Sequence, residues 1–187
     1  MKARWTRWLP PLVMAVAMAW VIEHLSADRR SSFMRVPVGH GPTPAWNMPD
    51  LAGNRIDSTN FLGKIVVLNF WATWCPPCRQ EIPELNAFHL SHTNDGVTVI
   101  GASVDDGGAD AVRPFVQRMK IAYPVVLADA LQQSHFGGAS LGPSTGGMSL
   151  PTTLVIDRQG HFVARYLGAL TQKELDSAIS PLLSGSP

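Results

Sequence analysis

The chain contains only two cysteines, Cys75 and Cys78, and two prolines separate them. They follow a β-branched apolar stretch and precede a segment with helical periodicity. A Cys-x-x-Cys pair at such a strand-to-helix junction is typical of sites that form and break disulfides. With no further cysteine in the sequence, a second disulfide and a four-cysteine zinc site are both excluded. All thiol chemistry of this chain is therefore assigned to one pair.

The composition is that of a folded domain with no electrostatic affinity for nucleic acid. Hydrophobic residues make up 45% of the 187 residues and charged residues 16%, which favours a globular domain over disorder. The chain has fifteen basic and fourteen acidic residues, and residues 1–30 contain five of the basic and two of the acidic ones. The remainder therefore has ten basic and twelve acidic residues, a net charge of −2. A near-neutral domain offers no electrostatic basis for binding DNA or RNA, and we exclude nucleic acid as a partner.

The first 25 residues have the pattern of an export signal. Three basic residues precede an uncharged stretch from Trp8 to Ile22, which predicts a cytoplasmic N-terminus and export of the remainder. Residues 17–19 fit the small-x-small pattern of a signal-peptide cleavage site. The uncharged stretch is also shorter than a full membrane span, which needs about 20 residues. Tryptophans near both ends of the run suit a membrane interface. We expect residues 1–25 to be a signal anchor, with a cleaved signal peptide or a buried helix as alternatives.

The residues after this segment divide into a linker and a domain. Residues 26–44 are rich in Ser, Arg, Gly and Pro and show no sustained periodicity, so we expect a flexible tether. Residues 45–187 are expected to form one α/β domain, because strand and helix patterns alternate along them. The expected strands are a hairpin over 45–57, with its turn at Gly53-Asn54, then 64–71, 97–104, 123–127, 152–157 and 161–167. The expected helices are a turn capped by Ser58, then 76–91, 109–119, 130–136 and a last helix that Thr171 caps with Glu174.

Two motifs carry a resemblance to a known family. The first is the run Asn-Phe-Trp-Ala-Thr-Trp-Cys-Pro-Pro-Cys-Arg-Gln-Glu-Ile-Pro over residues 69–83, and the second is Leu-Pro-Thr-Thr-Leu-Val-Ile-Asp over residues 150–157. With the hairpin and a closing Leu167-Gly168, they resemble the thioredoxin fold, and more narrowly the membrane-anchored thioredoxin-like proteins of the TlpA/ResA type. The similarity covers about residues 41–183. It implies a thioredoxin fold with an N-terminal β-hairpin cap and a mixed sheet flanked by helices, preceded by one membrane segment.

The resemblance also implies an activity and a location. Members of this family are thiol-disulfide oxidoreductases held on the periplasmic side of the bacterial cytoplasmic membrane, and they need no cofactor or metal. They commonly reduce disulfides of apocytochromes c or of copper-centre assembly proteins, and they take electrons from a membrane thiol donor. On this basis we expect a protein disulfide reductase whose partners are proteins with disulfides, a membrane electron donor and the inner membrane.

Dithiol chemistry assigns a different role to each cysteine. Cys75 lies at the expected helix N-terminus, where free N–H groups favour a thiolate, so we expect it to attack the substrate disulfide. Cys78, one turn further on, is expected to resolve the mixed disulfide. Pro76 suits the first helical position, and Pro77 has no N–H to offer the Cys75 sulfur. The thiolate of Cys75 is then only moderately stabilised, which favours a reductase over an oxidase.

Several other residues are expected to support the pair. Trp74 is expected to shield Cys75 and to contact substrate, with core packing as the alternative, and Trp71 is expected in the core. Glu81, one turn beyond Cys78, is a candidate for proton transfer, with a solvated helix face as the alternative. The resemblance implies a cis peptide at Pro151 that presents backbone to the substrate, which makes Leu150 a candidate contact. The glycine-containing loop over 137–148 is expected to influence partner choice.

One departure from thioredoxin and four rival functions bear on the assignment. Thioredoxin has a buried aspartate where this chain has Asn69, so another group must take that role or it is missing. A peroxiredoxin requires Thr or Ser three residues before its reactive cysteine, and Ala72 and Cys75 occupy those places. His89 and His92 follow Cys78 at a spacing too short for a zinc finger and are expected on the helix surface. A Cu(I) chaperone and a disulfide oxidase using the same cysteines stay open as alternatives.

Overall fold

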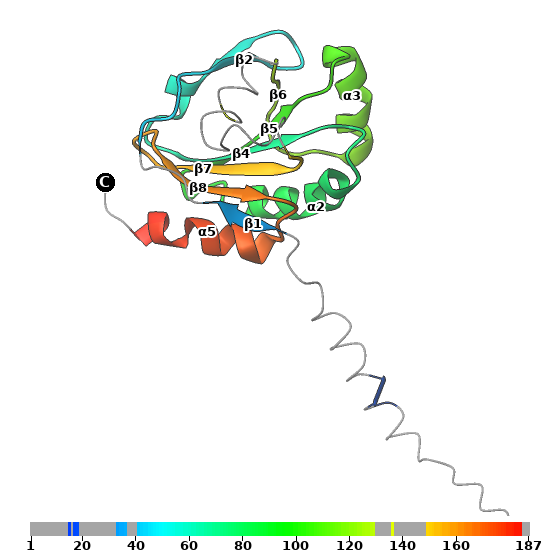
Figure 1. Ribbon diagram of the computed structural model, residues 1–187, viewed down its shortest axis with the longest axis vertical. Helices are drawn as coiled ribbons and strands as arrows, with labels where there is room; N and C mark the ends of the chain where they lie inside the picture. Colours follow the sequence, from blue (N-terminus) through cyan, green and yellow to red (C-terminus); the bar gives the residue numbers. More distant parts are fainter. Residues whose placement is uncertain are drawn as a thin grey trace, which may run out of the picture. The chain divides into compact units, whose positions relative to one another are not determined.

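The computed structural model describes residues 33–36, 41–129, 136 and 149–184, and residues 15, 17 and 18 nearer the N-terminus (Figure 1). The chain divides into two units, residues 1–32 and 33–187. Most of the expected signal anchor lies outside the described residues, as do the expected helix over 130–136, except for Phe136, and the loop over 137–148. Within the described part, no helix is long and apolar enough to cross a membrane.

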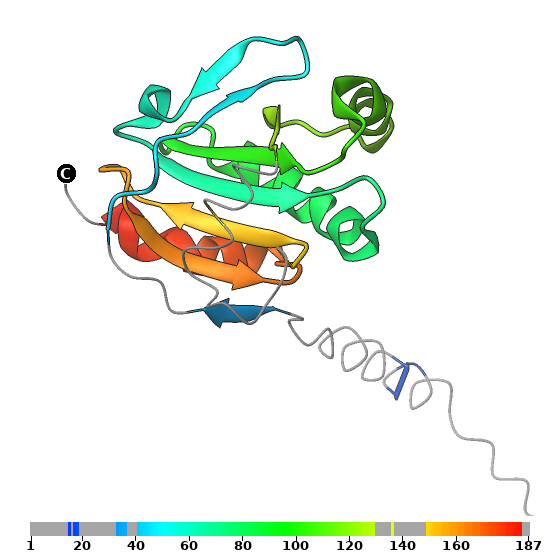
Figure 2. The same ribbon diagram turned by 45° about the horizontal axis from the view of Figure 1, so that its top comes forward.

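The second unit is built on a six-stranded mixed sheet in the order β1-β8-β7-β4-β5-β6 (Figure 2). Strands β4, β5 and β6 run parallel, whereas β7, β8 and β1 add to β4 in antiparallel steps. Two further strands, β2 and β3, form a separate hairpin. The strands are β1 (Met34–Val36), β2 (Asn47–Pro49), β3 (Arg55–Asp57), β4 (Ile65–Trp71), β5 (Val97–Ser103), β6 (Val125–Leu127), β7 (Thr152–Ile156) and β8 (Phe162–Leu167). The helices are the 3-10 helix η1 (Ser58–Phe61), α2 (Pro76–Ser91), α3 (Gly108–Met119) and α5 (Gln172–Ser184).

Strand β4 is the centre of the fold, and all seven of its residues are buried. A nearly continuous apolar run with β-branched side chains suits a strand covered on both faces. On one face, Val67 and its neighbours pack with α2 and α5 in a core that includes Leu85 and Ile179. On the other face, Leu68 and its neighbours pack in a core that includes Met48 of the hairpin. This buried strand ends at Trp71, and the segment with the two cysteines follows directly, so the centre of the sheet holds the start of that segment in place.

The structure confirms the α/β sheet and most expected elements, and it corrects three details. The tether prediction is wrong for Met34–Val36, which form strand β1 on the edge of the sheet by pairing with β8. The sequence pattern predicts that the hairpin over 152–167 closes the sheet at one edge, but β1 lies outside this β7–β8 hairpin. The N-cap of η1 is Asp57 rather than Ser58, because the Asp57 carboxylate accepts the Thr59 N–H while the Asn60 side chain accepts the Asp57 N–H.

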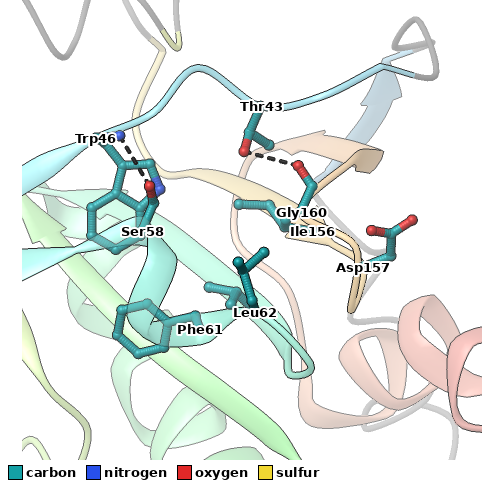
Figure 3. A pocket seen from close by; sticks show the side chains of 9 residues that line it. Thr43, Trp46, Ser58, Phe61, Leu62, Ile156, Asp157 and Gly160 are labelled. Carbon is teal, nitrogen blue, oxygen red and sulfur yellow. Dashed lines mark hydrogen bonds between the residues drawn. The ribbon is translucent and has the colours of Figure 1, made fainter. Parts of the chain in front are cut away.

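A small cavity lies where the chain before the hairpin meets the β7–β8 turn (Figure 3). Its volume is about 20 Å³, which is room for about one water molecule. Thr43 Oγ1 donates to the Gly160 carbonyl at 3.0 Å on one side, and the Trp46 N–H donates to Ser58 Oγ at 3.3 Å on the other. Neither cysteine lines this space, so it belongs to the packing of the hairpin against the sheet rather than to the cysteine site.

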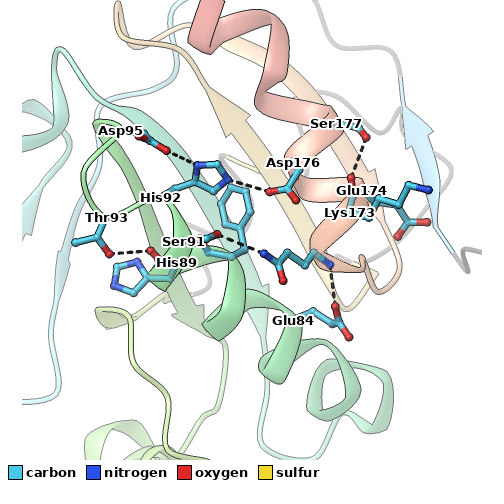
Figure 4. Close-up of polar contacts among 12 residues, drawn as sticks. Glu84, His89, Ser91, His92, Thr93, Asp95, Lys173, Glu174, Asp176 and Ser177 are labelled. Atoms are coloured by element: carbon cyan, nitrogen blue, oxygen red, sulfur yellow. Dashed lines mark hydrogen bonds and ion pairs between the residues drawn. The ribbon is translucent and has the colours of Figure 1, made fainter.

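Helices α2 and α5 are joined by polar contacts around His92, which directly follows α2 (Figure 4). Its Nδ1 lies 2.7 Å from a carboxylate oxygen of Asp95, and its Nε2 lies 2.9 Å from one of Asp176 in α5. Burial lowers the pKa of His92, but the carboxylates of Asp176 and Asp95 outweigh burial and raise the pKa above its usual value. The protonated ring therefore stabilises the folded state below about pH 6.5, and this stabilisation is lost as pH rises through the raised pKa.

We expect His92→Gln to lower the free energy of unfolding by about 1 kcal/mol at pH 5.5 and by less at pH 9, because only the charged ring gains from both carboxylates. Urea unfolding of wild type and variant at the two pH values measures the difference. An equal loss at both pH values would contradict an ionic role for His92.

Arg165 in β8 is a fully buried cation. It lies opposite Leu154 of β7 and Val36 of β1, and its three guanidinium nitrogens have no hydrogen-bond partner in the part of the chain that the structure describes. Burial lowers the pKa of Arg165, because desolvation opposes its charged form. An uncompensated buried charge destabilises a folded protein.

We expect Arg165→Met to raise the free energy of unfolding by at least about 1 kcal/mol, since methionine fills similar space without a charge. Urea unfolding measures the change, and Lys173→Met on the exposed side of α5 is the control, expected to stay within about 0.5 kcal/mol of wild type. A loss of stability in Arg165→Met would show that the guanidinium has a compensating contact.

Candidate active site

The two cysteines form a disulfide at the N-terminus of α2. Cys75 is the N-cap residue in an extended conformation, and its sulfur accepts the Cys78 N–H at 3.3 Å. Pro76 and Pro77 occupy the first two helical positions, where their fixed φ fits the helix. The exposed fractions are only 3% for Cys75 and 1% for Cys78. The junction thus has the expected arrangement, with one sulfur at the helix N-terminus and the other one turn inside it.

The two tryptophans of the motif have opposite environments. Trp74, directly before Cys75, is 64% exposed, so the core-packing alternative is wrong for this residue. Trp71 is fully buried and stacks on Phe115 of α3, with ring centroids 5.3 Å apart, which confirms its core position. Gly101 makes this packing possible, because a Cβ there would lie 2.8 Å from the Trp71 ring nitrogen. An exposed indole beside a nearly buried disulfide is an apolar surface available to a partner protein.

Glu81 is a buried acid behind the disulfide, 1% exposed, so the solvated-face alternative is wrong. One carboxylate oxygen accepts the Leu170 N–H at 2.9 Å, and the other accepts Asn69 Nδ2 at 2.9 Å. Burial raises the pKa of Glu81 to about 7, and the hydrogen bonds from Leu170, Asn69 and Thr153 only partly oppose it. A buried carboxyl group thus lies in hydrogen-bond contact with Asn69, the position at which thioredoxin has its aspartate.

The second motif begins just before β7, and its first residue packs against the cluster that contains the two cysteines. The Leu150–Pro151 peptide bond is cis, as the resemblance implies. The Pro151 carbonyl accepts the Gly168 N–H at 2.9 Å, which ties this turn to the end of β8. Leu150 is partly buried and packs against the apolar cluster that contains Cys75 and Cys78. Trp74 is exposed and Leu150 is partly buried, whereas Pro151 is buried, and substrate contact by these three residues stays a prediction.

Sequence reasoning missed three residues next to the cysteines. Asp105, which follows β5, accepts two hydrogen bonds from Thr73, and Arg79 of α2 donates to the Thr73 carbonyl. A pair of aspartates directly after a buried strand is a signal that could have indicated a polar group at this edge of the sheet.

His89 and His92, the two histidines of the zinc-finger alternative, do not lie close to the cysteines. His89 and His92 lie at the C-terminal end of α2, and the helical rise places His89 about 16 Å from Cys78 along the axis. Ligands of one zinc ion lie within a few ångströms of each other, so a shared site is excluded. Both histidines are half-buried rather than exposed on the helix surface.

Comparison with known proteins agrees with this geometry. Residues 40–165 match the AhpC/TSA family. The thiol-disulfide oxidoreductase ResA of Bacillus anthracis is 32% identical over 139 residues, which cover 74% of this chain and 75% of that protein.

Two solved structures have the same fold. A thiol:disulfide interchange protein of the thioredoxin family from Chlorobium tepidum TLS has a TM-score of 0.68 at 28% identity, covering 80% of this chain and all of that one. A secreted thiol-disulfide isomerase from Corynebacterium glutamicum has a TM-score of 0.69 at 27% identity, covering 84% and 95%. The chain therefore belongs to the thioredoxin-like AhpC/TSA family, and its relatives together with the Cys75–Cys78 disulfide identify it as a thiol-disulfide oxidoreductase.

Proposed function

We propose that this protein is an exported protein disulfide reductase that acts through Cys75 and Cys78. The observation that favours a reductase over an oxidase is the hydrogen bond that the Cys78 N–H donates to the Cys75 sulfur. This N–H is the one hydrogen-bond donor to the sulfur among the residues that the structure describes, and Pro77 cannot add a second one. A thiolate with modest stabilisation corresponds to a reduced form that gives up electrons readily.

The reaction proceeds in two exchange steps. In the reduced enzyme, the Cys75 thiolate attacks one sulfur of a substrate disulfide, forms a mixed disulfide and releases the other substrate sulfur as a thiolate. Cys78 then loses its proton and attacks the Cys75 sulfur, which releases the second substrate thiolate and restores the enzyme disulfide. Two electrons pass from the dithiol to the substrate. A separate dithiol donor must reduce the enzyme again.

Glu81 is the proton acceptor that suits the second step. It lies three residues beyond Cys78 on α2, and positions three apart in a helix are neighbours. With a pKa of about 7, it can take a proton from a thiol and return it near neutral pH. Its contact with Asn69 holds the carboxylate in place while the protonation state changes.

Location and partners follow from the N-terminal pattern and the family. The basic and apolar residues at positions 1–25 support a signal anchor that holds the domain on the periplasmic side of the cytoplasmic membrane. The substrates would be exported proteins with disulfides, such as apocytochromes c or copper-centre assembly proteins. A membrane thiol donor would supply the electrons. Exposed Trp74 with Leu150 and Pro151 would form the contact surface for these proteins.

Insulin reduction with dithiothreitol tests the proposed activity. Wild type should accelerate the precipitation of the insulin B chain, and Cys75→Ser should fall to the rate of dithiothreitol alone, because the attacking sulfur is gone. Wild type without activity, but with one tightly bound Cu(I) per chain, would overturn the reductase in favour of the chaperone.

A further inference from the structure

Thr73, two residues before Cys75, has all of its polar groups hydrogen-bonded. Its N–H donates to the two carboxylate oxygens of Asp105 at 3.0 and 3.3 Å, and its Oγ1 donates to the same carboxylate at 2.6 Å. Its carbonyl accepts two hydrogen bonds from Arg79, from Nε at 2.9 Å and Nη2 at 2.7 Å. A loop residue held from both sides in this way has little freedom to rotate.

Asp105 is itself held firmly by the sheet. Ser103 Oγ donates to the Asp105 carboxylate at 2.8 Å and accepts the Asp105 N–H at 3.2 Å. Ser103 is the last residue of β5 and pairs with Trp71, the last residue of β4. The Val104 N–H also donates to the Trp71 carbonyl at 2.9 Å. The carboxylate is thus fixed to the sheet at the point where the cysteine loop begins.

Arg79 holds the loop from the side of the helix. It follows Cys78 in the first turn of α2, and its guanidinium also lies 5.9 Å from the centre of the Phe115 ring. The planar fork of an arginine reaches one carbonyl through two nitrogens, which a lysine cannot reproduce. The loop between β4 and α2 is therefore attached through Thr73 to the segment that follows β5 and to the first turn of α2.

The two residues that follow Thr73 depend on this attachment. Trp74 is largely exposed, so the backbone rather than core packing determines where its indole lies. Cys75 must keep its extended N-cap conformation for its sulfur to receive the Cys78 N–H. Rotation at Thr73 would displace both side chains.

We propose that Asp105 and Arg79 are positioning residues that hold Thr73, and through it present Trp74 and Cys75 to the substrate in one orientation. The inference rests on the proposed reductase activity. A displacement of about 1 Å at a reacting group can slow a reaction by a factor of about 100. The clamp formed by Asp105, Thr73 and Arg79 would thus set the rate of the first exchange step without touching the reacting sulfurs.

Asp105→Ala and Thr73→Val test the clamp, with Asp106→Ala as the matched control, because Asp106 is the adjacent and exposed aspartate. The reduced full-length protein is mixed with oxidised insulin, and the second-order rate is measured. The pH dependence of Cys75 alkylation is measured in parallel. We expect both clamp variants to react at least about tenfold more slowly and to need a higher pH for alkylation, while Asp106→Ala matches wild type.

The double variant separates the clamp from a general loss of stability. Because the Oγ1 hydrogen bond lost in Thr73→Val is one of those lost in Asp105→Ala, the double variant should be no slower than the slower single one, whereas independent defects would multiply. Arg79→Met should share the slower reaction, and Arg79→Lys should restore it only in part. An inactive wild type would refute the reductase itself. An active wild type with equally active Asp105→Ala and Thr73→Val, each with an unchanged alkylation profile, would overturn the clamp alone.

Discussion

The Cys78→Ser variant is expected to accumulate its protein substrate as a mixed disulfide on Cys75, whereas wild type holds almost none. Cys75 at the helix N-terminus can still attack, but no second thiol remains to release the substrate. The effect is close to all or none, because the two cysteines are the only ones in the chain. Non-reducing electrophoresis of the variant with a disulfide-containing substrate measures the trapped complex.

The matched control for trapping is Cys75→Ser. In this variant Cys78 keeps its thiol, but that thiol lies one turn inside α2 and not at the helix N-terminus from which Cys75 attacks. We therefore expect no complex, or a trace of it. A complex of equal amount in both variants would show that the assignment of attacking and resolving cysteines is wrong.

Glu81→Gln is expected to stabilise the oxidised protein above neutral pH. The pKa of this acid is about 7 in the folded state and about 4.5 when solvated, because burial opposes its charged form. Between these two values the unfolded chain releases its proton while the folded one keeps it, so stability falls as pH rises. The loss is about 3 kcal/mol and complete above about pH 7. Glutamine carries no such proton.

Urea unfolding of wild type and Glu81→Gln at pH 4 and pH 8 measures this linkage. The difference in free energy of unfolding between variant and wild type should be about 3 kcal/mol more favourable to the variant at pH 8 than at pH 4. A difference that does not change with pH would contradict the buried-acid assignment. The same variant should reduce insulin at least about tenfold more slowly and lack the rate inflection near pH 7, because no group accepts the Cys78 proton.

Local sequence patterns were enough to predict the centre of this fold. The apolar run of β4 and the periodicity of α2 lie within a few residues of each other, so the Cys75 junction follows from the amino-acid sequence alone. Strand β1 could not be predicted in this way, because its three residues show no clear pattern and form a strand only by pairing with β8, which is distant in sequence.

The site shows the same division between local and distant contacts. Cys75, Cys78 and Glu81 follow from spacing along one helix. The partner of Glu81 at Leu170 is 89 positions away, and Asp105 is 32 positions from Thr73. Such hydrogen bonds depend on how the strands are ordered in the sheet, which no local pattern records. The burial of Arg165 could not be predicted from the sequence either, since an arginine is normally expected at the surface.

The reduction potential of the Cys75–Cys78 disulfide tests the reductase account most directly. Equilibration of the purified protein with defined ratios of reduced and oxidised dithiothreitol, followed by counting free thiols, gives this value. One hydrogen bond to the Cys75 sulfur predicts a potential closer to the about −270 mV of thioredoxin than to the about −120 mV of the oxidase DsbA. A value near −120 mV would contradict the account and make the protein a disulfide oxidase.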